Sequence, residues 1–225
     1  RHYEVLIRMR DEQGEIIPPM AFIPAAERYN LMPAVDRWVI KTAFAHYIKA
    51  ADAQSSLLIY SINLSGASIG DEHFLSFVCE QLAIFGVPPR GICFEITETS
   101  AIANLSRAAA LIRELKAIGC RFSLDDFGSG MSSFSYLKKL PVDFLKIDGS
   151  FVKDMVDDPI DRAMVEAINH IGHIMGIQTI AEYVENEAIF QELRKIGVDF
   201  AQGYGIGRPA PLDECSNECE TMIIV

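Results

Sequence analysis

The sequence predicts an α/β fold built on a parallel β-sheet. Three observations support this prediction: short β-rich runs alternate with amphipathic stretches, they recur at a spacing of about 20 to 35 residues, and no low-complexity linker interrupts them. Strands separated by helices are typical of parallel sheets, because parallel neighbours need a long crossover connection. We therefore expect a single domain over residues 1–225.

The predicted strands are short runs rich in β-branched and aromatic residues. In chain order they are HYEVLIRM (2–9), LLIYSINLS (57–65), GICFEITET (91–99), CRFSLDDFG (120–128), VDFLKIDGS (142–150), IQTIAEYVE (177–185) and VDFAQGYGIG (198–207). Between them, amphipathic stretches end at Gly86, Gly119, Gly176 and Gly197, where glycine is typical of a helix C-terminus. Asp158 followed by Pro159 predicts a helix start.

The spacing is compatible with a barrel or with a doubly wound sheet. A (β/α) barrel has eight strands in about 250 residues, so we expect its first strand upstream of residue 1, in a longer, multidomain protein. The doubly wound alternative lacks the GxGxxG and Walker A sequences that would support it. The aromatic-rich segment 36–47 is expected to be a packed helix, Trp38 included.

Composition excludes several functions. The formal net charge is −11 and lysine and arginine form no long cluster, so a nucleic-acid polymer is not the expected partner. No uncharged run approaches the ~18 residues of a membrane span, so we expect no membrane contact by this domain. The five scattered cysteines predict neither a disulfide framework nor a zinc site.

Polar residues gather at or just after the ends of the predicted strands. They are Glu4, Arg8, Asn63, Glu95, Glu98, Asp125, Asp126, Lys146, Asp148, Glu182, Glu185 and Gln202. In a barrel the carboxyl ends of all strands meet at one face, where active sites lie. Taken singly, each of these residues could instead be a solvated strand end or a helix cap.

Acidic residues beside hydrophobic runs are costly to bury unless a cation neutralises them. Carboxylate and amide oxygens without histidine or cysteine favour Mg²⁺ or Mn²⁺ over Zn²⁺. Such a metal-loaded site would bind phosphate in spite of the negative net charge, assisted by Lys146 and Arg8. The pattern therefore predicts metal-assisted hydrolysis of a phosphodiester.

The motifs resemble those of EAL domains, the bacterial phosphodiesterases of cyclic di-GMP. The segments that carry the resemblance are Glu4-Val5-Leu6 with Arg8, FIPAAE (22–27), INLS (62–65), FEITE (94–98), DDFGSGMSS (125–133), LPVDFLKID (140–148), AEYVE (181–185) and QGY (202–204). The resemblance implies a TIM-like (β/α)8 barrel with one antiparallel strand. It also implies hydrolysis of cyclic di-GMP to linear pGpG, with one or two Mg²⁺ or Mn²⁺ ions per site.

The resemblance assigns a role to each residue. It implies that the metal ligands are Glu4, Asn63, Glu95, Asp125 and Asp126. It also implies three catalytic residues: Glu182 acts as the general base, Lys146 holds the attacking water or the phosphate, and Asp125 takes part as well. Substrate-binding or ordering positions are Leu6, Arg8, Asp148, Glu185 and Gln202, and Glu98 anchors the loop after DDFG.

Several residues differ from the family pattern. Val5 replaces an alanine, Ser129 and Met131 replace threonine and tyrosine, Tyr183 replaces a glycine beside the expected base, and Gly149 replaces an arginine. All expected metal ligands are present, so we expect an enzyme; the alternatives are a cyclic di-GMP receptor without hydrolysis and a purely structural regulatory domain. The resemblance also implies a homodimer in the bacterial cytoplasm, free or as the cytoplasmic part of a membrane-anchored sensor.

Overall fold

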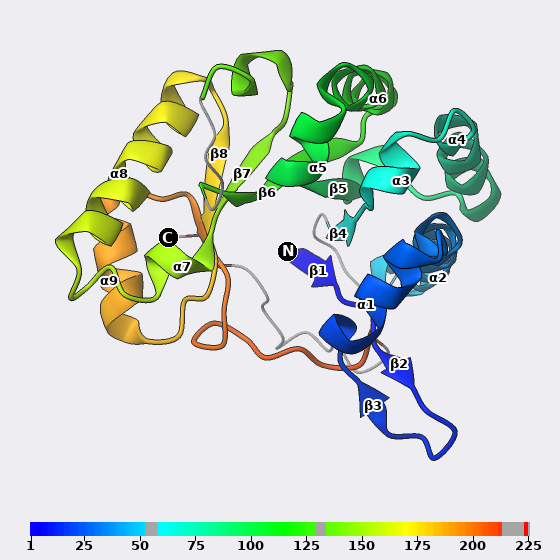
Figure 1. The fold of residues 1–225 in the computed structure, drawn as a ribbon, viewed down its shortest axis with the longest axis horizontal. Coiled ribbons are helices and arrows are strands. Elements are labelled where there is room, and N and C mark those ends of the chain that lie inside the picture. Colours follow the sequence, from blue (N-terminus) through cyan, green and yellow to red (C-terminus); the bar gives the residue numbers. More distant parts are fainter. Residues whose placement is uncertain (53–57, 129–133, 213–222, 225) are drawn as a thin grey trace.

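The computed structural model describes residues 1–52, 58–128, 134–212 and 223–224. Its centre is an eight-stranded sheet that curls within a rim of helices (Figure 1). In spatial order the strands are β1 (His2–Val5), β4 (Ile59–Asn63), β5 (Ile92–Thr97), β6 (Arg121–Phe127), β7 (Phe144–Ile147), β8 (Gln178–Ala181), β9 (Phe200–Ala201) and β10 (Ile223–Ile224). Neighbours are parallel except for β10, which pairs antiparallel with β9.

The predicted α/β architecture is confirmed, since all seven predicted strands are present as β1 and β4 to β9. The sheet contains one antiparallel strand, as the family resemblance implied. Within the described residues β1 and β10 do not pair, so the sheet is a curled half-barrel rather than a closed ring. A small antiparallel hairpin of β2 (Met9–Arg10) and β3 (Ile16–Ile17) was not predicted.

The helices follow the strands along the chain. They are α1 (Pro19–Arg28), α2 (Met32–Asp52), α3 (Gly66–Ile69), α4 (Phe74–Phe85), α5 (Glu98–Ala103), α6 (Leu105–Ile118), α7 (Gly149–Val152), α8 (Pro159–Ile174) and α9 (Glu187–Ile196), with short 3₁₀ turns at Pro89–Gly91 and Leu137–Lys139. The glycine signals are confirmed, because Gly86, Gly119, Gly176 and Gly197 all have positive φ at helix ends. Asp158 caps α8 by accepting a hydrogen bond from the Ile160 amide at 2.7 Å.

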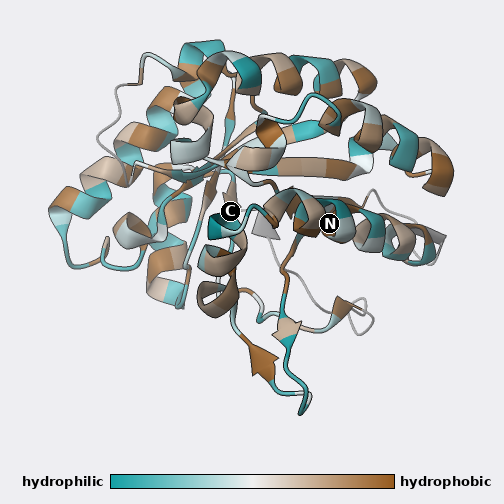
Figure 2. Cartoon of the chain, turned by 45° about the vertical axis from the view of Figure 1, so that its right-hand side comes forward, coloured by the Kyte–Doolittle hydropathy of each residue, from teal (hydrophilic) through white to brown (hydrophobic). Residues whose placement is uncertain are grey.

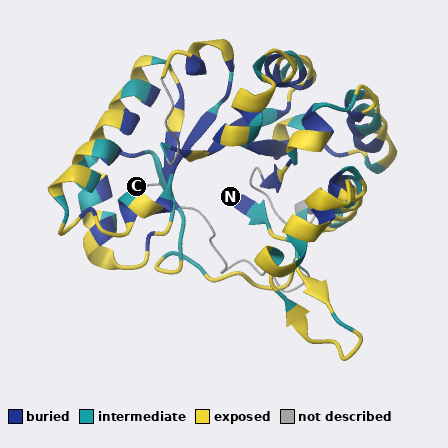
Figure 3. Cartoon of the chain, viewed as in Figure 1, coloured by how far each residue is buried: buried dark blue, intermediate teal, exposed yellow. Residues whose placement is uncertain are grey.

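The main hydrophobic core lies between the sheet and the helices. Figure 3 shows buried strands inside a rim of helices with exposed outer faces, and Figure 2 shows hydrophobic and hydrophilic residues alternating along those helices. Phe94 and Phe122 of neighbouring strands pack in this core with Leu115 of α6. Among the described residues, no helix combines the length and apolar character that crossing a membrane requires.

A second, smaller cluster occupies the inner face of the curled sheet. It consists of Ile59, Cys93, Phe144 and Ile180, one residue from each of four strands, with Phe200 packed against it. Because successive side chains of a strand point to opposite faces, residues two and four positions further along share this inner face. The inner face is therefore apolar at this end, and Glu95 and Lys146 follow on it toward the carboxyl ends of the strands.

Candidate functional site

Strand alternation brings the predicted site residues together. Glu95 and Lys146 lie two residues beyond Cys93 and Phe144, on the same inner face of β5 and β7. Glu182 follows Ile180 by the same step, directly after the end of β8. The predicted convergence of these side chains at the carboxyl ends of the strands is thus observed.

The centre of the cluster is the ammonium group of Lys146, whose residue is 0% exposed. Its Nζ lies 2.9 Å from Glu95 Oε2, 3.0 Å from Asp125 Oδ1 and 2.8 Å from Glu182 Oε1. Glu4 Oε2 lies at 3.4 Å. Four carboxylates from distant parts of the sequence thus surround one buried positive charge.

Two carboxamides orient Glu4. Asn63 Nδ2 donates a hydrogen bond to Glu4 Oε1 at 2.8 Å, and Gln202 Nε2 donates to Glu4 Oε2 at 2.6 Å. Burial raises the pKa of Glu4, but the charge of Lys146 and these two hydrogen bonds outweigh it and lower the pKa overall. Glu4 is therefore held as a carboxylate beside β4 and β9.

The other acids respond differently to burial. Burial, reinforced by neighbouring carboxylates, raises the pKa of Glu95 to about 8 and that of Glu182 to about 7, although Lys146 opposes both shifts. Burial disfavours a charged Lys146, yet the surrounding carboxylates prevail and raise its pKa well above the usual value. The cluster carries more acidic groups than its single ammonium can neutralise.

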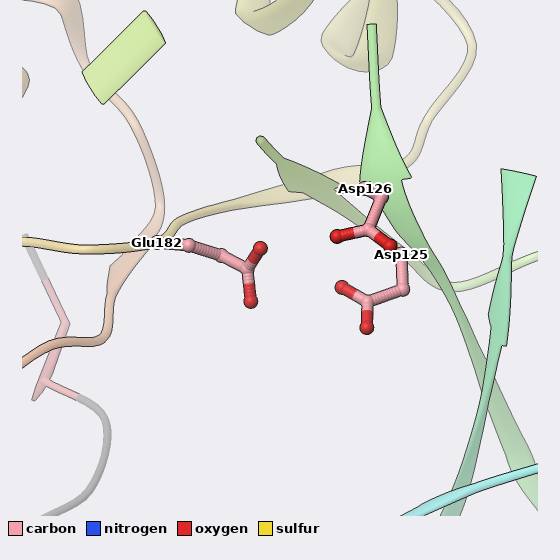
Figure 4. Close-up of side chains that lie close together, drawn as sticks. All are labelled: Asp125, Asp126 and Glu182. Atoms are coloured by element: carbon pink, nitrogen blue, oxygen red, sulfur yellow. The ribbon is translucent and has the colours of Figure 1, made fainter. Parts of the chain in front are cut away.

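Asp125 and Asp126 are consecutive, yet both lie near Glu182 (Figure 4). In a regular strand they would point to opposite faces. Asp126 instead has φ +54, and the pairing of β6 with β7 shifts register between Leu124 and Phe127. This bulge turns the second acid toward the first, so that one oxygen from each of Asp125, Asp126 and Glu182 lies within 4.8 Å of the others.

The donor set fits a divalent cation. Within the described residues, the buried oxygens Glu95 Oε1 and Asp125 Oδ1 have no hydrogen-bond partner, although the latter is within ion-pair distance of Lys146. The side chains of Asp125, Asp126 and Glu182 lie close together and offer only carboxylate oxygens as ligands. Hard cations such as Mg²⁺ and Mn²⁺ prefer such ligands.

Glu98 joins both sides of the segment that follows β6. Its Oε2 accepts a hydrogen bond from the Gly128 amide at 3.2 Å, and its Oε1 accepts one from the Tyr136 hydroxyl. The side chain is buried at the start of α5. Glu98 thus contacts residues on both sides of this segment, of which Ser129 and Met131 lie outside the described residues.

A cavity of about 700 Å³ opens beside the acidic cluster. Its lining includes the predicted substrate residues Leu6, Arg8, Glu185 and Gln202, together with Glu4, Glu182, Trp38, Tyr183 and Tyr204. Asp148 does not line it; its carboxylate caps α7 by accepting a hydrogen bond from the Ser150 amide at 2.8 Å. Arg8 is exposed on the cavity wall, where its Nη1 donates to the Ile7 carbonyl at 2.8 Å.

Two aromatic residues of this cavity, Trp38 and Tyr183, are not among the site residues expected from the sequence. Trp38 was expected inside a packed helix but is 58% exposed, while Ile40 and Phe44 of the same helix are buried. Helical periodicity could have indicated that Trp38 is exposed, because it lies about 200° around the helix from the buried Ile40. Tyr183, which replaces a glycine of the family motif, is 62% exposed at the cavity.

Comparison with known sequences gives one consistent result. A family model described as "EAL domain" matches residues 1–209. The chain is 46% identical over 220 residues to the cyclic di-GMP phosphodiesterase PdeB of Shewanella oneidensis, covering 98% of this chain and 26% of PdeB. It is 36% identical to the cyclic di-GMP phosphodiesterase PdeF of Escherichia coli, covering 97% of this chain and 29% of PdeF. The chain thus spans between a quarter and a third of these relatives' length.

Solved structures of the same kind superpose well. The structure titled PaMucR phosphodiesterase, c-di-GMP complex, matches with a TM-score of 0.89 at 32% identity, covering 94% of this chain and 85% of that one. The FimX EAL domain from Pseudomonas aeruginosa bound to c-di-GMP matches with a TM-score of 0.86 at 30% identity, again covering 94% of this chain and 85% of that one.

Proposed function

Because the chain belongs to the EAL domain family, we propose that it is a metal-dependent phosphodiesterase that hydrolyses cyclic di-GMP to linear pGpG. The observation that carries this proposal is the acidic cluster around Lys146, which opens into a cavity of about 700 Å³ through Glu4 and Glu182. Relatives of similar sequence are named as phosphodiesterases of this dinucleotide.

The proposed metal is Mg²⁺ or Mn²⁺, one or two ions per site. Its proposed ligands are Glu4, Asn63, Glu95, Asp125 and Asp126. When bound, such an ion lowers the pKa of a water molecule and neutralises charge on the phosphodiester. Two observations support this assignment: the buried Glu95 Oε1 has no hydrogen-bond partner among the described residues, and Asp125 and Asp126 lie close together.

Glu182 is the proposed general base. A base works best when its pKa lies near the operating pH, and burial raises the pKa of Glu182 to about 7. Its Oε1 lies 2.8 Å from Lys146 Nζ, so the ammonium orients the carboxylate and stabilises its charged form. Lys146 would also donate a hydrogen bond to the attacking water or to a phosphate oxygen.

The substrate is proposed to occupy the cavity with its phosphate at the acidic end. Leu6 offers an apolar surface, Arg8 and Glu185 offer charges of opposite sign, and Gln202 keeps one buried oxygen without a partner among the described residues. Asp148 contributes indirectly, by capping α7 beside Asp126.

The direct test is turnover of cyclic di-GMP by the purified chain with Mg²⁺ or Mn²⁺, followed by chromatography, with EDTA as the metal-free control. We expect metal-dependent pGpG, and we expect Glu182→Gln to lower kcat by about 10²-fold or more while the substrate Kd stays within a few-fold. Binding without any product would instead favour a cyclic di-GMP receptor, and comparable turnover by Glu182→Gln would overturn the role of Glu182.

We further propose that residues 1–225 are one EAL domain of a longer cytoplasmic or membrane-anchored signalling protein that acts as a homodimer. The short share of the relatives' length that the chain covers supports the larger protein. Sedimentation equilibrium of the full-length protein, with and without cyclic di-GMP, tests the dimer; a monomer at micromolar concentration would overturn it.

A further inference from the structure

Tyr183 adopts a backbone conformation that tyrosine rarely adopts. Its φ is +54, in the left-handed region, and only Asn30 and Asp126 share this property among the described non-glycine residues. Two of these three residues directly follow carboxylates of the acidic cluster, Asp125 and Glu182. Such strain persists only where the surrounding structure enforces it, and it is concentrated at functional sites.

The chain on both sides enforces the conformation of Tyr183. The Glu182 amide donates to the Ile147 carbonyl at 3.3 Å, and the Val184 amide donates to the Gln202 carbonyl at 3.0 Å. The Val184 carbonyl accepts from the Gly205 amide at 2.8 Å. The backbone on both sides of Tyr183 is therefore held by β7 and by the segment after β9.

The ring of Tyr183 covers Gly149. A Cβ atom added at Gly149 would lie 2.1 Å from Tyr183 Cδ2 and 2.6 Å from Tyr183 Cγ. Gly149 does not have the positive φ that would call for glycine, and it lies in the first turn of α7, where glycine is less stable than alanine. Space for the tyrosine ring is thus the reason for glycine at this position.

The two departures from the family motif, Tyr183 and Gly149, are therefore one structural feature. The tyrosine is 62% exposed and lines the cavity beside Glu182. Among the described residues, its ring stacks on no other aromatic ring and its hydroxyl forms no hydrogen bond. It presents a supported aromatic surface at the acidic end of the cavity.

We propose that Tyr183, held over Gly149, is a substrate-positioning residue that stacks against a nucleobase of the bound cyclic dinucleotide. This inference rests on the proposed function, since a phosphate at Glu182 places its attached nucleoside beside residue 183. Aromatic side chains bind bases through their faces with little sequence preference. Gly149 contributes only by leaving room for the ring.

The test is a double-mutant cycle on the intact chain with Tyr183→Gly, Gly149→Ala and the double variant, and with Tyr183→Phe as the matched control. Kd for cyclic di-GMP is measured by calorimetry in EDTA, KM and kcat are measured with Mg²⁺, and thermal denaturation checks folding. Glycine is favoured at a left-handed position, so Tyr183→Gly is expected to fold.

We expect Tyr183→Gly to raise Kd and KM about tenfold, in line with base stacking, with a smaller effect on kcat, and Tyr183→Phe to stay within about twofold. Gly149→Ala should weaken binding when Tyr183 is present and have no further effect in the double variant. Unchanged Kd and KM in Tyr183→Gly would overturn the inference, as would a tenfold loss in Tyr183→Phe.

The two proposals fail in different ways. If the unmodified chain binds cyclic di-GMP but forms no pGpG, hydrolysis is refuted, and the comparison of Kd values still decides the role of Tyr183. If the unmodified chain does not bind cyclic di-GMP at all, both proposals are refuted.

Discussion

At the scale of single residues, the charge of Lys146 makes the acidic cluster compatible with burial. The ammonium lies within 3.4 Å of oxygens from four carboxylates, and the lysine residue is 0% exposed. Removing one partner of a buried ion pair is costly, because the remaining charges lose both water and their counter-charge. Lys146 is therefore structural as well as a proposed participant in the reaction.

We expect Lys146→Met to lower the free energy of unfolding by about 3–5 kcal/mol, measured by urea denaturation in EDTA. The control is Lys195→Met, because the Lys195 Nζ lies 2.6 Å from Glu192 Oε1 but its side chain is 66% exposed. Exposed pairs contribute about 1 kcal/mol or less. Equal effects of the two substitutions would show that the buried acids do not need the lysine.

His2 predicts how stability responds to acid. Burial, aided by the charge of Lys146, lowers the pKa of His2 to about 3, and its Nε2 lies 2.6 Å from Ser61 Oγ. Because the folded pKa lies below the unfolded value, the stabilising contribution is complete above pH 6.5 and is lost as the pH falls toward 3.

Between pH 6.5 and 5 we expect the unfolding free energy to fall more steeply in the wild type than in His2→Gln, by up to about 1.4 kcal/mol per pH unit. Urea denaturation across this pH range measures the difference. The matched control is His170→Gln, which removes an exposed histidine of α8. Identical slopes in the wild type and His2→Gln would contradict the prediction.

At the scale of elements, the ends of strands and helices position the site. The bulge in β6 turns Asp126 toward Asp125. The start of α5 places Glu98 within hydrogen-bond distance of Gly128 and Tyr136, which lie on either side of the segment after β6. Each arrangement joins two elements through a side chain or a backbone irregularity. The site therefore depends on how elements end more than on their regular interiors.

We expect Glu98→Ala to lower kcat at least tenfold without removing any proposed metal ligand, because Gly128 follows the Asp125–Phe127 end of β6 and would lose its anchor. Hydrogen exchange should show faster exchange of the Gly128 amide. Tyr136→Phe, which removes only one of the two hydrogen bonds, should have the smaller effect. Unchanged amide exchange in Glu98→Ala would refute the anchor.

At the scale of the whole molecule, the cluster connects strands that are far apart in the sequence. Glu4, Glu95 and Asp125 come from β1, β5 and β6, and Lys146 comes from β7. A cation bound by several strands would bind the folded chain and not the unfolded one. Such binding stabilises the fold by about 2.7 kcal/mol when the free ion is at one hundred times its Kd.

We therefore expect Mn²⁺ to raise the Tm relative to EDTA, with a shift that grows with the Mn²⁺ concentration. Asp125→Asn should reduce that shift, whereas Asp161→Asn in the first turn of α8 should retain it. Differential scanning calorimetry over a series of Mn²⁺ concentrations provides the measurement. A full shift in Asp125→Asn would show that Asp125 is not a ligand.

Local patterns determined a large part of this protein. β-rich runs and terminal glycines predicted the seven strands and the ends of four helices, because backbone preferences act over a few residues. The gathering of polar residues at the ends of the predicted strands indicated that their side chains would meet at one face of the barrel. Together with the motif resemblance, it was enough to select the acids, the asparagine and the lysine of the site.

Only the tertiary structure decided the contacts between those residues. It placed Lys146 among four carboxylates, turned Asp126 out of the strand alternation and set the ring of Tyr183 over Gly149. It also exposed Trp38 on the cavity wall and left β1 and β10 unpaired with each other within the described residues. These features depend on residues tens of positions apart, whose distances are set by packing the whole sheet and not by any local preference.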